Sequence, residues 1–253
     1  MIYIKTGKAI DYIRESSRIV AETLVLLRKS VREGMTTREL DDIAEDYILS
    51  QDGIPAFKGY PDGTSDSFPA ALCCSVNDEV VHGIPGEKKL KSGDILSLDV
   101  GVVKRGFYGD GATTIGICEI DREKQRLMDV TERSLYLGIE QAVEGNRIRD
   151  ISYAVQSYVE ANGFSVVRDL CGHGVGKHLH EDPSIPNYGK KGNGPKIQTG
   201  MTLAIEPMIN AGGYEVKTSR DGWTVVTKDG SASAHFEHTI LVNGVKPEIL
   251  TIC

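Results

Sequence analysis

The sequence lacks paired cysteines and long apolar runs, and these absences exclude several classes of protein. Five cysteines form an odd set without CxxC spacing, which indicates neither a disulfide framework nor a zinc finger: Cys73, Cys74, Cys118, Cys171 and Cys253. No uncharged apolar run approaches the roughly 18 residues that a membrane span needs. The opening segment, MIYIKTGKAIDYIRESS, is interrupted by charges and has no signal-peptide core. We expect a soluble, cytoplasmic protein with no membrane partner.

An excess of basic residues is also missing. Lysine and arginine number 29 against 36 acidic residues, which leaves a net charge of −7 and argues against a nucleic-acid partner. What the chain does have is 253 residues with 40% apolar content, enough for a large core. No linker rich in Pro, Gly or Ser divides it, so we expect a single catalytic domain over residues 1–253.

Hydrophobic periodicity predicts the same order of elements in both halves of the chain. Helical spacing occurs from about residue 6 to 30, from Thr36 to Asp52, where Thr36 and Glu39 resemble a capping box, and over 122–143 and 149–162. Strand-like runs follow each helical pair, at 70–76 and in a hairpin at 99–110, and then at 165–168, 201–209, 223–227 and 235–242. This order predicts an α+β fold with two related halves that share an antiparallel sheet.

The stretch from residue 99 to 110, DVGVVKRGFYGD, predicts a β-hairpin with glycine near its turn. A turn centred on Lys104 and Arg105 would place Asp99 opposite Asp110, and a bulge at Gly106 would shift this pairing by one residue. In either case two carboxylates become near neighbours. Like charges side by side on a strand pair are destabilising unless a cation lies between them, so the hairpin indicates a metal ion.

Further acidic and imidazole groups follow the hairpin: His173, His180, Glu206 and Glu237. His173 lies between glycines, where the backbone can approach a ligand closely. Glu206 and Glu237 lie in apolar runs, where an unpaired charge is expensive to bury. With Asp99 and Asp110, these two glutamates and His173 form an oxygen-rich set that suits one or two divalent ions, of which the sequence does not rank Mn, Fe(II), Co or Zn.

Each of these residues also has an ordinary structural interpretation. A lone glutamate in a strand is more often salt-bridged or at an exposed edge, the hairpin aspartates could face solvent, and His173 could mark a turn. Periodicity does not bring the five residues together. A dinuclear metal site is therefore a hypothesis at this point, and a dinuclear phosphoesterase remains an alternative.

The glycine run at Gly172–Lys177 suggests a second interpretation, a loop that cradles phosphate. A P-loop would need glycine at Cys171 and serine or threonine at His178, and a dinucleotide fingerprint would need glycine at Lys177. Neither pattern is present, so we do not expect a nucleotide.

Several motifs in order resemble the type I methionine aminopeptidases, metallopeptidases with the pita-bread fold. They are Asn77-x4-His82-Gly-Ile-Pro, Ser97-Leu-Asp99-Val-Gly with Gly109-Asp110, Cys171-Gly-His173-Gly-Val-Gly with His180-Glu, Ile205-Glu206-Pro, and Asp221-Gly-Trp223-Thr through Glu237-His-Thr. The likeness covers nearly the whole chain. It implies a curved antiparallel sheet flanked by helices, and two divalent metal ions held by Asp99, Asp110, His173, Glu206 and Glu237, with Asp110 and Glu237 bridging.

The resemblance also implies a reaction, the removal of the initiator methionine from a nascent polypeptide or peptide with a small second residue. Two metals would activate a water that attacks the first peptide carbonyl. His180 would stabilise the developing negative charge, Glu206 would carry the proton to the leaving amine, and His82 would orient the substrate or shuttle a proton. We expect the enzyme to be a monomer.

The family's methionine pocket maps onto residues that suit a thioether: Tyr60, Phe57, Cys73, Leu179 and Trp223. Trp223 also has an ordinary interpretation as core packing. Residues 62–72 form a longer loop than in many relatives, which puts the pocket shape in question but leaves the metal ligands untouched.

Two other functions belong to the same fold. An aminopeptidase P or prolidase usually carries an extra N-terminal domain and a different sequence after its second aspartate, whereas Gly-Ala-Thr-Thr follows Asp110 here. A non-catalytic peptide-binding module would have lost ligands, and all five ligand positions are filled in this chain. The sequence therefore favours the methionine aminopeptidase.

Overall fold

The computed structural model describes residues 1–61 and 66–253, so part of the long loop at 62–72 lies outside the described residues. Within this range the helices are α1 (Lys8–Ser30), α2 (Thr37–Ser50), α3 (Arg122–Glu140) and α4 (Ile148–Ala161). The strands of the first half are β1 (Ile54–Pro55), β2 (Leu72–Val76), β3 (Glu79–Val81), β4 (Ile95–Lys104) and β5 (Phe107–Gly116). Those of the second half are β6 (Ser165–Val166), β7 (Cys171–Gly174), β8 (Glu181–Pro186), β9 (Thr202–Ile205), β10 (Met208–Asn210), β11 (Val216–Thr218), β12 (Val225–Thr227), β13 (Ser233–His235), β14 (Glu237–Leu241) and β15 (Glu248–Ile249).

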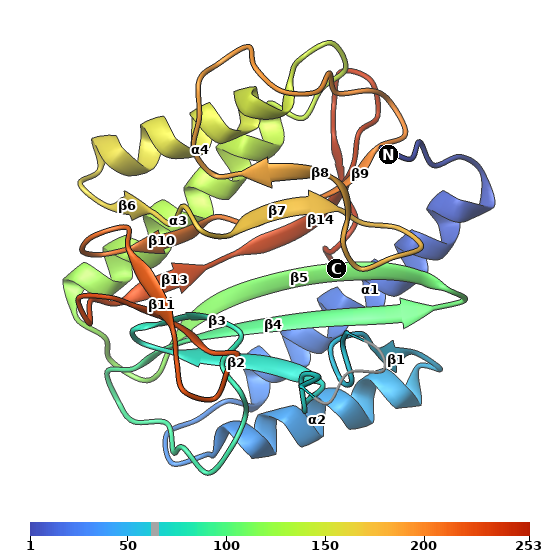
Figure 1. The fold of residues 1–253 in the computed structure, drawn as a ribbon. Helices are drawn as coiled ribbons and strands as arrows, with labels where there is room; N and C mark the ends of the chain where they lie inside the picture. Colours follow the sequence, from blue (N-terminus) through green and yellow to red (C-terminus); the bar gives the residue numbers. More distant parts are fainter. Residues whose placement is uncertain (62–65) are drawn as a thin grey trace.

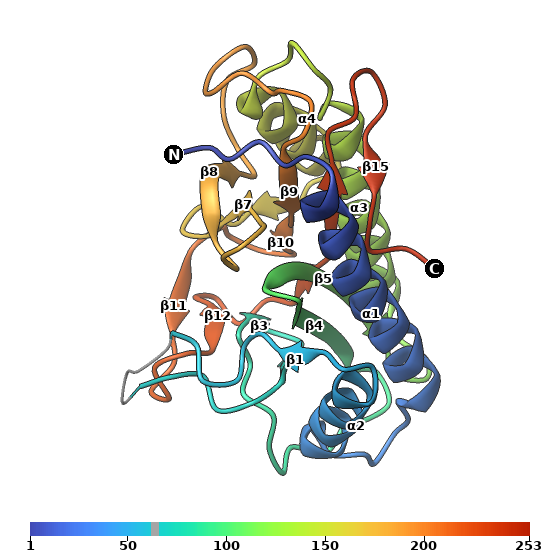
Figure 2. The same cartoon turned by 90° about the vertical axis from the view of Figure 1, so that its right-hand side faces the viewer.

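A nine-stranded sheet runs through both halves, in the order β1-β4-β5-β14-β9-β7-β8, with β2 added on β4 and β15 on β14. Its pairings are antiparallel. Figures 1 and 2 show a curved sheet with α1 and α3 along one side and the small sheet that contains β11 and β12 on the other. The expected α+β architecture, an antiparallel curved sheet flanked by helices in two related halves, is confirmed.

The helices of the first half begin and end where their sequences predict. Thr36 accepts the backbone N–H of Glu39 at 3.2 Å, and the Glu39 carboxylate accepts the backbone N–H of Thr36 at 2.7 Å. This reciprocal capping box satisfies donors that the first turn of α2 leaves without helical partners. None of the helices among residues 1–61 and 66–253 is long and apolar enough to cross a membrane.

The β4–β5 hairpin forms as predicted, but its register differs from the expected one. Lys104 pairs with Phe107, so the two-residue turn is Arg105-Gly106, and both residues have positive φ, 53° and 75°. Positive φ at both central positions matches the right-handed strand twist, and this outweighs the steric cost at Arg105. Asp99 therefore pairs with Ala112, and Asp110 pairs with Gly101.

The two aspartates are diagonal neighbours on one face rather than an opposed pair. Positions 99 and 101 of β4 lie on the same face of the sheet because side chains alternate along a strand. Asp110 lies directly across from Gly101 and therefore on the face that carries the Asp99 side chain. The expectation that the two carboxylates become near neighbours holds through this diagonal, although the predicted direct pairing is wrong.

Two runs predicted as single strands in the second half are interrupted. The 201–209 run forms β9 and β10, separated at Glu206-Pro207, and the 235–242 run is divided at Phe236 between β13 and β14. Proline lacks the N–H that a central strand donates, which explains the first break. At this break the side-chain amide of Asn187 donates a hydrogen bond to the backbone carbonyl of Glu206 at 2.9 Å.

Each half has its own hydrophobic core on the helical side of the sheet. One packs α1 and α2 against β2, β4 and β5 and includes the fully buried Leu96, Leu98 and Val100. The other packs α3 and α4 against β9 and β14 and includes the fully buried Leu203 and Ile240. The side chains that alternate with these apolar residues therefore point to the opposite face, where the polar groups converge.

Candidate metal centre

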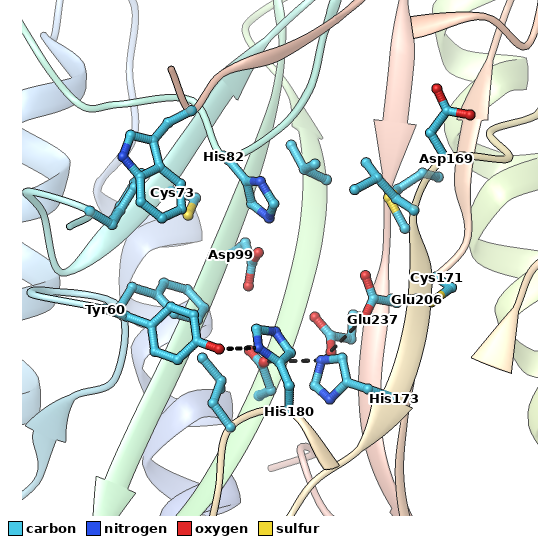
Figure 3. Close-up of a pocket in the computed structure, with 18 residues that line it drawn as sticks. Tyr60, Cys73, His82, Asp99, Asp169, Cys171, His173, His180, Glu206 and Glu237 are labelled. Carbon is cyan, nitrogen blue, oxygen red and sulfur yellow. Dashed lines mark hydrogen bonds and ion pairs between the residues drawn. The ribbon is translucent and has the colours of Figure 1, made fainter. Parts of the chain in front are cut away.

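The five residues proposed as ligands converge on the concave side of the sheet from five strands or strand ends. Asp99 comes from β4 and Asp110 from β5, while His173, Glu206 and Glu237 come from β7, the end of β9 and the start of β14. Figure 3 shows Asp99 facing Glu206, Glu237 and His173 across the cavity. Ligand atoms of Asp110, His173 and Glu237 lie within 4.8 Å of one another, the spacing of groups that could share an ion.

Hydrogen bonding of His173 determines which of its ring nitrogens faces the carboxylates. Nδ1 lies 2.9 Å from the carbonyl oxygen of Gly174, an acceptor, so Nδ1 carries the proton and Nε2 keeps its lone pair. Nε2 lies 3.3 Å from Glu206 Oε1 and 3.8 Å from Asp110 Oδ2. Burial lowers the pKa of His173 to about 3, so the ring is neutral. A lone pair aimed at two carboxylates is a geometry that a cation between them would satisfy.

Close backbone packing holds His173 in this position. β7 and β8 change register between Gly172 and Gly174, the irregularity from which His173 projects. A Cβ atom on Gly172 would lie 2.4 Å from the carbonyl oxygen of Ala204, and one on Gly174 would lie 2.3 Å from that of Asp182. The glycines around His173 therefore serve close strand packing. Because the run continues into a turn and β8 rather than a helix, it offers no helix N-terminus for phosphate, in agreement with the sequence.

In the absence of a cation, ionisation of all four buried carboxyl groups of the site would cost much free energy. Burial raises the pKa of Asp110 to about 7. Burial, and then the charges of neighbouring carboxylates, raises the pKa of Asp99, Glu206 and Glu237. Four acids in one cavity repel one another and have lost hydration, which is the usual cause of such shifts.

Three carboxylate oxygens at the site are buried without a hydrogen-bond partner among the described residues, and this indicates whether the residues suit a metal ion. Asp99 Oδ1, Asp110 Oδ1 and Glu237 Oε1 are buried and have no hydrogen-bond partner within the described part of the chain. Unpartnered buried carboxylate oxygens are costly, and a divalent cation bound by oxygen and imidazole ligands would compensate them. The donor set therefore fits a divalent metal centre.

Two further histidines, His180 and His82, line the cavity. His180 lies at its open edge, where its Nδ1 is 2.7 Å from the Tyr60 hydroxyl and its ring meets His173 edge-on at 4.5 Å between centroids (Figure 3). His82 adopts a positive φ of 58°. Burial lowers the pKa of His82 to about 4, and removal from water also lowers the pKa of His180. Both rings are therefore neutral and can donate a hydrogen bond at near-neutral pH.

An apolar chamber opens directly onto the candidate metal centre. The cavity of about 380 Å³ includes all five residues expected to form the methionine pocket: Phe57, Tyr60, Cys73, Leu179 and Trp223. Phe57 also reaches Gly101, where a Cβ atom would lie 2.6 Å from the Phe57 ring. The volume suits a small ligand group.

Several residues at or beside the cavity were not predicted from the sequence, and two of them, Phe68 and His235, lie close to predicted site residues. Phe68 lines the chamber, and its ring meets Trp223 edge-on at 5.3 Å between centroids. The sequence did not predict it because it lies in the long loop at 62–72, whose effect on the shape of the pocket the sequence left open. His235 is 2% exposed, and its Nε2 lies 3.9 Å from Glu206 Oε2. Its signal was its place two residues before Glu237 in an apolar run, where a polar side chain is costly to bury without a partner.

Comparisons with known proteins agree with this geometry. The model of metallopeptidase family M24 matches residues 11–244. A methionine aminopeptidase of Clostridium perfringens is 52% identical over 100% of this chain and 99% of its own length. The crystal structure of a methionine aminopeptidase from Thermotoga maritima superimposes with a TM-score of 0.97 at 45% identity, with full coverage of both chains.

A more distant structure shares only the fold. The prolidase of Pyrococcus furiosus has a TM-score of 0.77 at 18% identity, and the match covers 99% of this chain but 65% of the prolidase. The family match and the full-length relatives together show that this chain is a member of metallopeptidase family M24, in its methionine aminopeptidase group with the pita-bread fold.

Proposed function

We propose that this protein removes the N-terminal methionine from nascent polypeptides and peptides whose second residue is small. The observation that carries the proposal is the apolar chamber, bounded by Phe57, Phe68 and Cys73, which opens onto a cluster of buried carboxylates and His173. An unbranched thioether side chain suits such a chamber, because its sulfur makes favourable contacts with aromatic rings. An exopeptidase needs this arrangement, a side-chain pocket beside the reacting carbonyl.

We infer that two divalent ions, Co, Mn, Fe(II) or Zn, are held by five residues: Asp99, Asp110, His173, Glu206 and Glu237. Asp110 and Glu237 would bridge the pair, which is supported by the spacing of their oxygens and by the orphaned atoms on both residues. The chemistry that such ions supply when bound is a water of lowered pKa and an electrophile for the carbonyl oxygen.

The residues around the metal centre have separate proposed tasks. His180 can accept a hydrogen bond from the Tyr60 hydroxyl at Nδ1, which leaves the ring proton on Nε2. Its Nε2–H then donates a hydrogen bond to the scissile carbonyl oxygen and stabilises the negative charge that develops there. Glu206 takes a proton from the attacking water and delivers it to the leaving amine. His82, neutral on the opposite wall, orients the substrate amide or shuttles a proton.

We further propose that the enzyme acts in the cytoplasm as a monomer, and that neither nucleic acid nor a membrane is a partner. The acidic net charge of −7 and the substrate, a free polypeptide N-terminus, support this part of the proposal.

Cleavage of matched peptides tests the activity. Metal-free protein, supplied in turn with Mn, Fe(II) or Co, should cleave Met-Gly-Met-Met and leave Xaa-Pro peptides intact. Peptides in which a bulky residue replaces glycine should be cleaved poorly. Cleavage of Xaa-Pro peptides alone would identify a prolidase-type enzyme, and a protein that binds no divalent ion and cleaves nothing would be a binding module.

A further inference from the structure

A buried ion pair joins the start of the chain to the turn that carries His180. The arm formed by residues 1–6 precedes α1 and runs past β8 in Figure 2. Within it, Lys5 Nζ lies 2.7 Å from Glu181 Oε2, and the two side chains are only 7% and 3% exposed. The backbone N–H of Lys5 donates to the carbonyl of Gly200 at 2.8 Å, which ties the arm to the turn before β9.

The other oxygen of Glu181 fastens the turn between β7 and β8. Glu181 Oε1 accepts the backbone N–H of Lys177 at 2.7 Å and that of His178 at 3.2 Å. One carboxylate therefore binds the lysine ammonium on one side and two consecutive backbone donors on the other. Hydrogen bonds and ion pairs with a carboxylate are stronger than those between neutral groups, so this one side chain links the arm to the turn.

Packing around the ion pair leaves little freedom. A Cβ atom on Gly176 would lie 2.6 Å from Lys5 Cε and 2.7 Å from Glu181 Oε1, so the lysine stem and the carboxylate fill the space beside the glycine backbone. The carbonyl of Gly176 accepts the backbone N–H of Tyr108 at 2.8 Å. The turn is thus held from β5, from the arm and from its own carboxylate.

The residues that the turn carries belong to the cavity. His180 directly precedes Glu181, and Leu179 is one of the chamber walls. On its other side the His180 ring is held through Nδ1 by the Tyr60 hydroxyl. The orientation of this imidazole is therefore set from two sides, by Tyr60 at the ring and by the Glu181 turn at the backbone.

A buried lysine–glutamate pair is a poor way to gain stability alone, because the desolvation of two charges offsets most of their attraction. Such a pair does impose a specific geometry, since both partners lose their compensation if either moves. Glu181 directly follows His180 in the chain, so the geometry imposed by the Lys5–Glu181 pair can set the position of the His180 imidazole.

We propose that Lys5 is a positioning residue for catalysis: through Glu181 it holds the turn that aims His180 at the scissile carbonyl. The inference rests on the proposed function in one respect, the action of His180 on the substrate. It extends the active-site assembly to the N-terminal arm, far from the cavity in sequence.

The test is a double-mutant cycle between Lys5→Met and His180→Ala in the metal-loaded protein. Lys5→Met should lower kcat about tenfold and change KM less than about twofold, because the carbonyl contact is lost mainly in the transition state. In the His180→Ala background the same substitution should change kcat little, since the group that it misplaces is already absent. Lys8→Met, which removes an exposed lysine three positions on, is the control and should leave both constants unchanged.

Each contrary outcome has a distinct meaning. An unchanged kcat in Lys5→Met, or an equal loss of kcat with and without His180, would overturn the positioning role and leave a structural one. Full activity of His180→Ala would instead overturn the role proposed for His180. If Lys5→Met does not fold, Lys5→Met/Glu181→Gln replaces it in the cycle, because glutamine keeps an oxygen for the two backbone donors and leaves no unpaired buried charge.

Discussion

The two halves of the molecule place the proposed metal ligands in the same cavity in different ways. In the first half, Asp99 and Asp110 project from β4 and β5, which pair without interruption from Ile95–Gly116 to Lys104–Phe107. In the second half, each proposed ligand lies at an irregularity or at a strand end: His173 at a register shift, Glu206 at the break before Pro207, and Glu237 at the start of β14.

This difference shows how a sheet can place several side chains at one point. A regular hairpin delivers ligands only at its fixed diagonal and cross-strand spacings. Further ligands must come from strands whose alternation is broken, because bulges and breaks re-aim side chains that the pleat would direct elsewhere. The second half carries these irregularities, while the first half provides the regular platform.

The seam between the halves coincides with the candidate metal centre. β5 and β14 pair directly only at Ala112–Glu237 and Gly111–His238. One residue further, the Thr239 hydroxyl donates to the Asp110 carbonyl at 2.7 Å in place of backbone pairing. Asp110 and Glu237, the two residues proposed to bridge the metals, thus lie on the two strands that join the halves.

Removal of a ligand from either half should have the largest effect on activity. Asp99→Asn and Glu237→Gln should each lower kcat/KM by at least about a thousandfold, roughly 4 kcal/mol, because each removes a charge that holds an ion. Metal analysis should find about one ion in Asp99→Asn and less than one in Glu237→Gln, since the latter loses a bridge. Near-normal activity in either variant, with circular dichroism unchanged, would refute the ligand assignment. Asp46→Asn, an exposed acid on α2, is the control.

Matched truncations in the two cores test whether the halves fold together. Leu98 and Leu203 are both fully buried, one in each core. We propose that the chain is a single folding unit, so Leu98→Ala and Leu203→Ala should each lower the free energy of unfolding by about 3 kcal/mol in one shared transition. Urea unfolding followed by circular dichroism and by fluorescence of Trp223, the single tryptophan, gives two probes. Two separated transitions would show independent halves, and Leu49→Ala at an exposed site is the control.

The smallest effect is expected at Asp41, which ties α2 to β2 within the first half. Its Oδ1 accepts the backbone N–H groups of Ala71 and Leu72, each at 2.9 Å, and burial raises its pKa. An acid with a raised folded pKa contributes stability below its unfolded pKa of about 3.9, and this contribution is lost as the pH rises through the folded pKa.

Asp41→Asn should therefore match the wild type at pH 3.5 and be more stable by up to about 1 kcal/mol at pH 7, because asparagine stays neutral and can accept the same bonds. Melting temperatures of both metal-free proteins across this range measure the difference. A variant that loses stability relative to the wild type as the pH rises would contradict the direction of the shift.

Local signals in the sequence were sufficient for the elements and for part of the site. The Thr36–Glu39 capping box, the helical periodicities and the hairpin depend on interactions between residues close in the chain, and all three are confirmed. The hairpin register was predicted wrongly because either Lys104-Arg105 or Arg105-Gly106 could form the turn. Arg105 adopts a positive φ because the pairing along the whole hairpin requires it, and the turn residues alone do not indicate this.

The sequence by itself determined the chemistry of this protein: which residues can bind a divalent ion, where the charges interrupt apolar runs, and which family those motifs resemble. Tertiary structure decided which of these groups meet. His173, Glu206 and Glu237 reach Asp99 and Asp110 only because β7, β9 and β14 are broken or shifted at those residues. Phe68 and Lys5 join the cavity and its supporting turn through contacts with residues far away in the chain. Such contacts follow from packing and burial, which local periodicity does not encode.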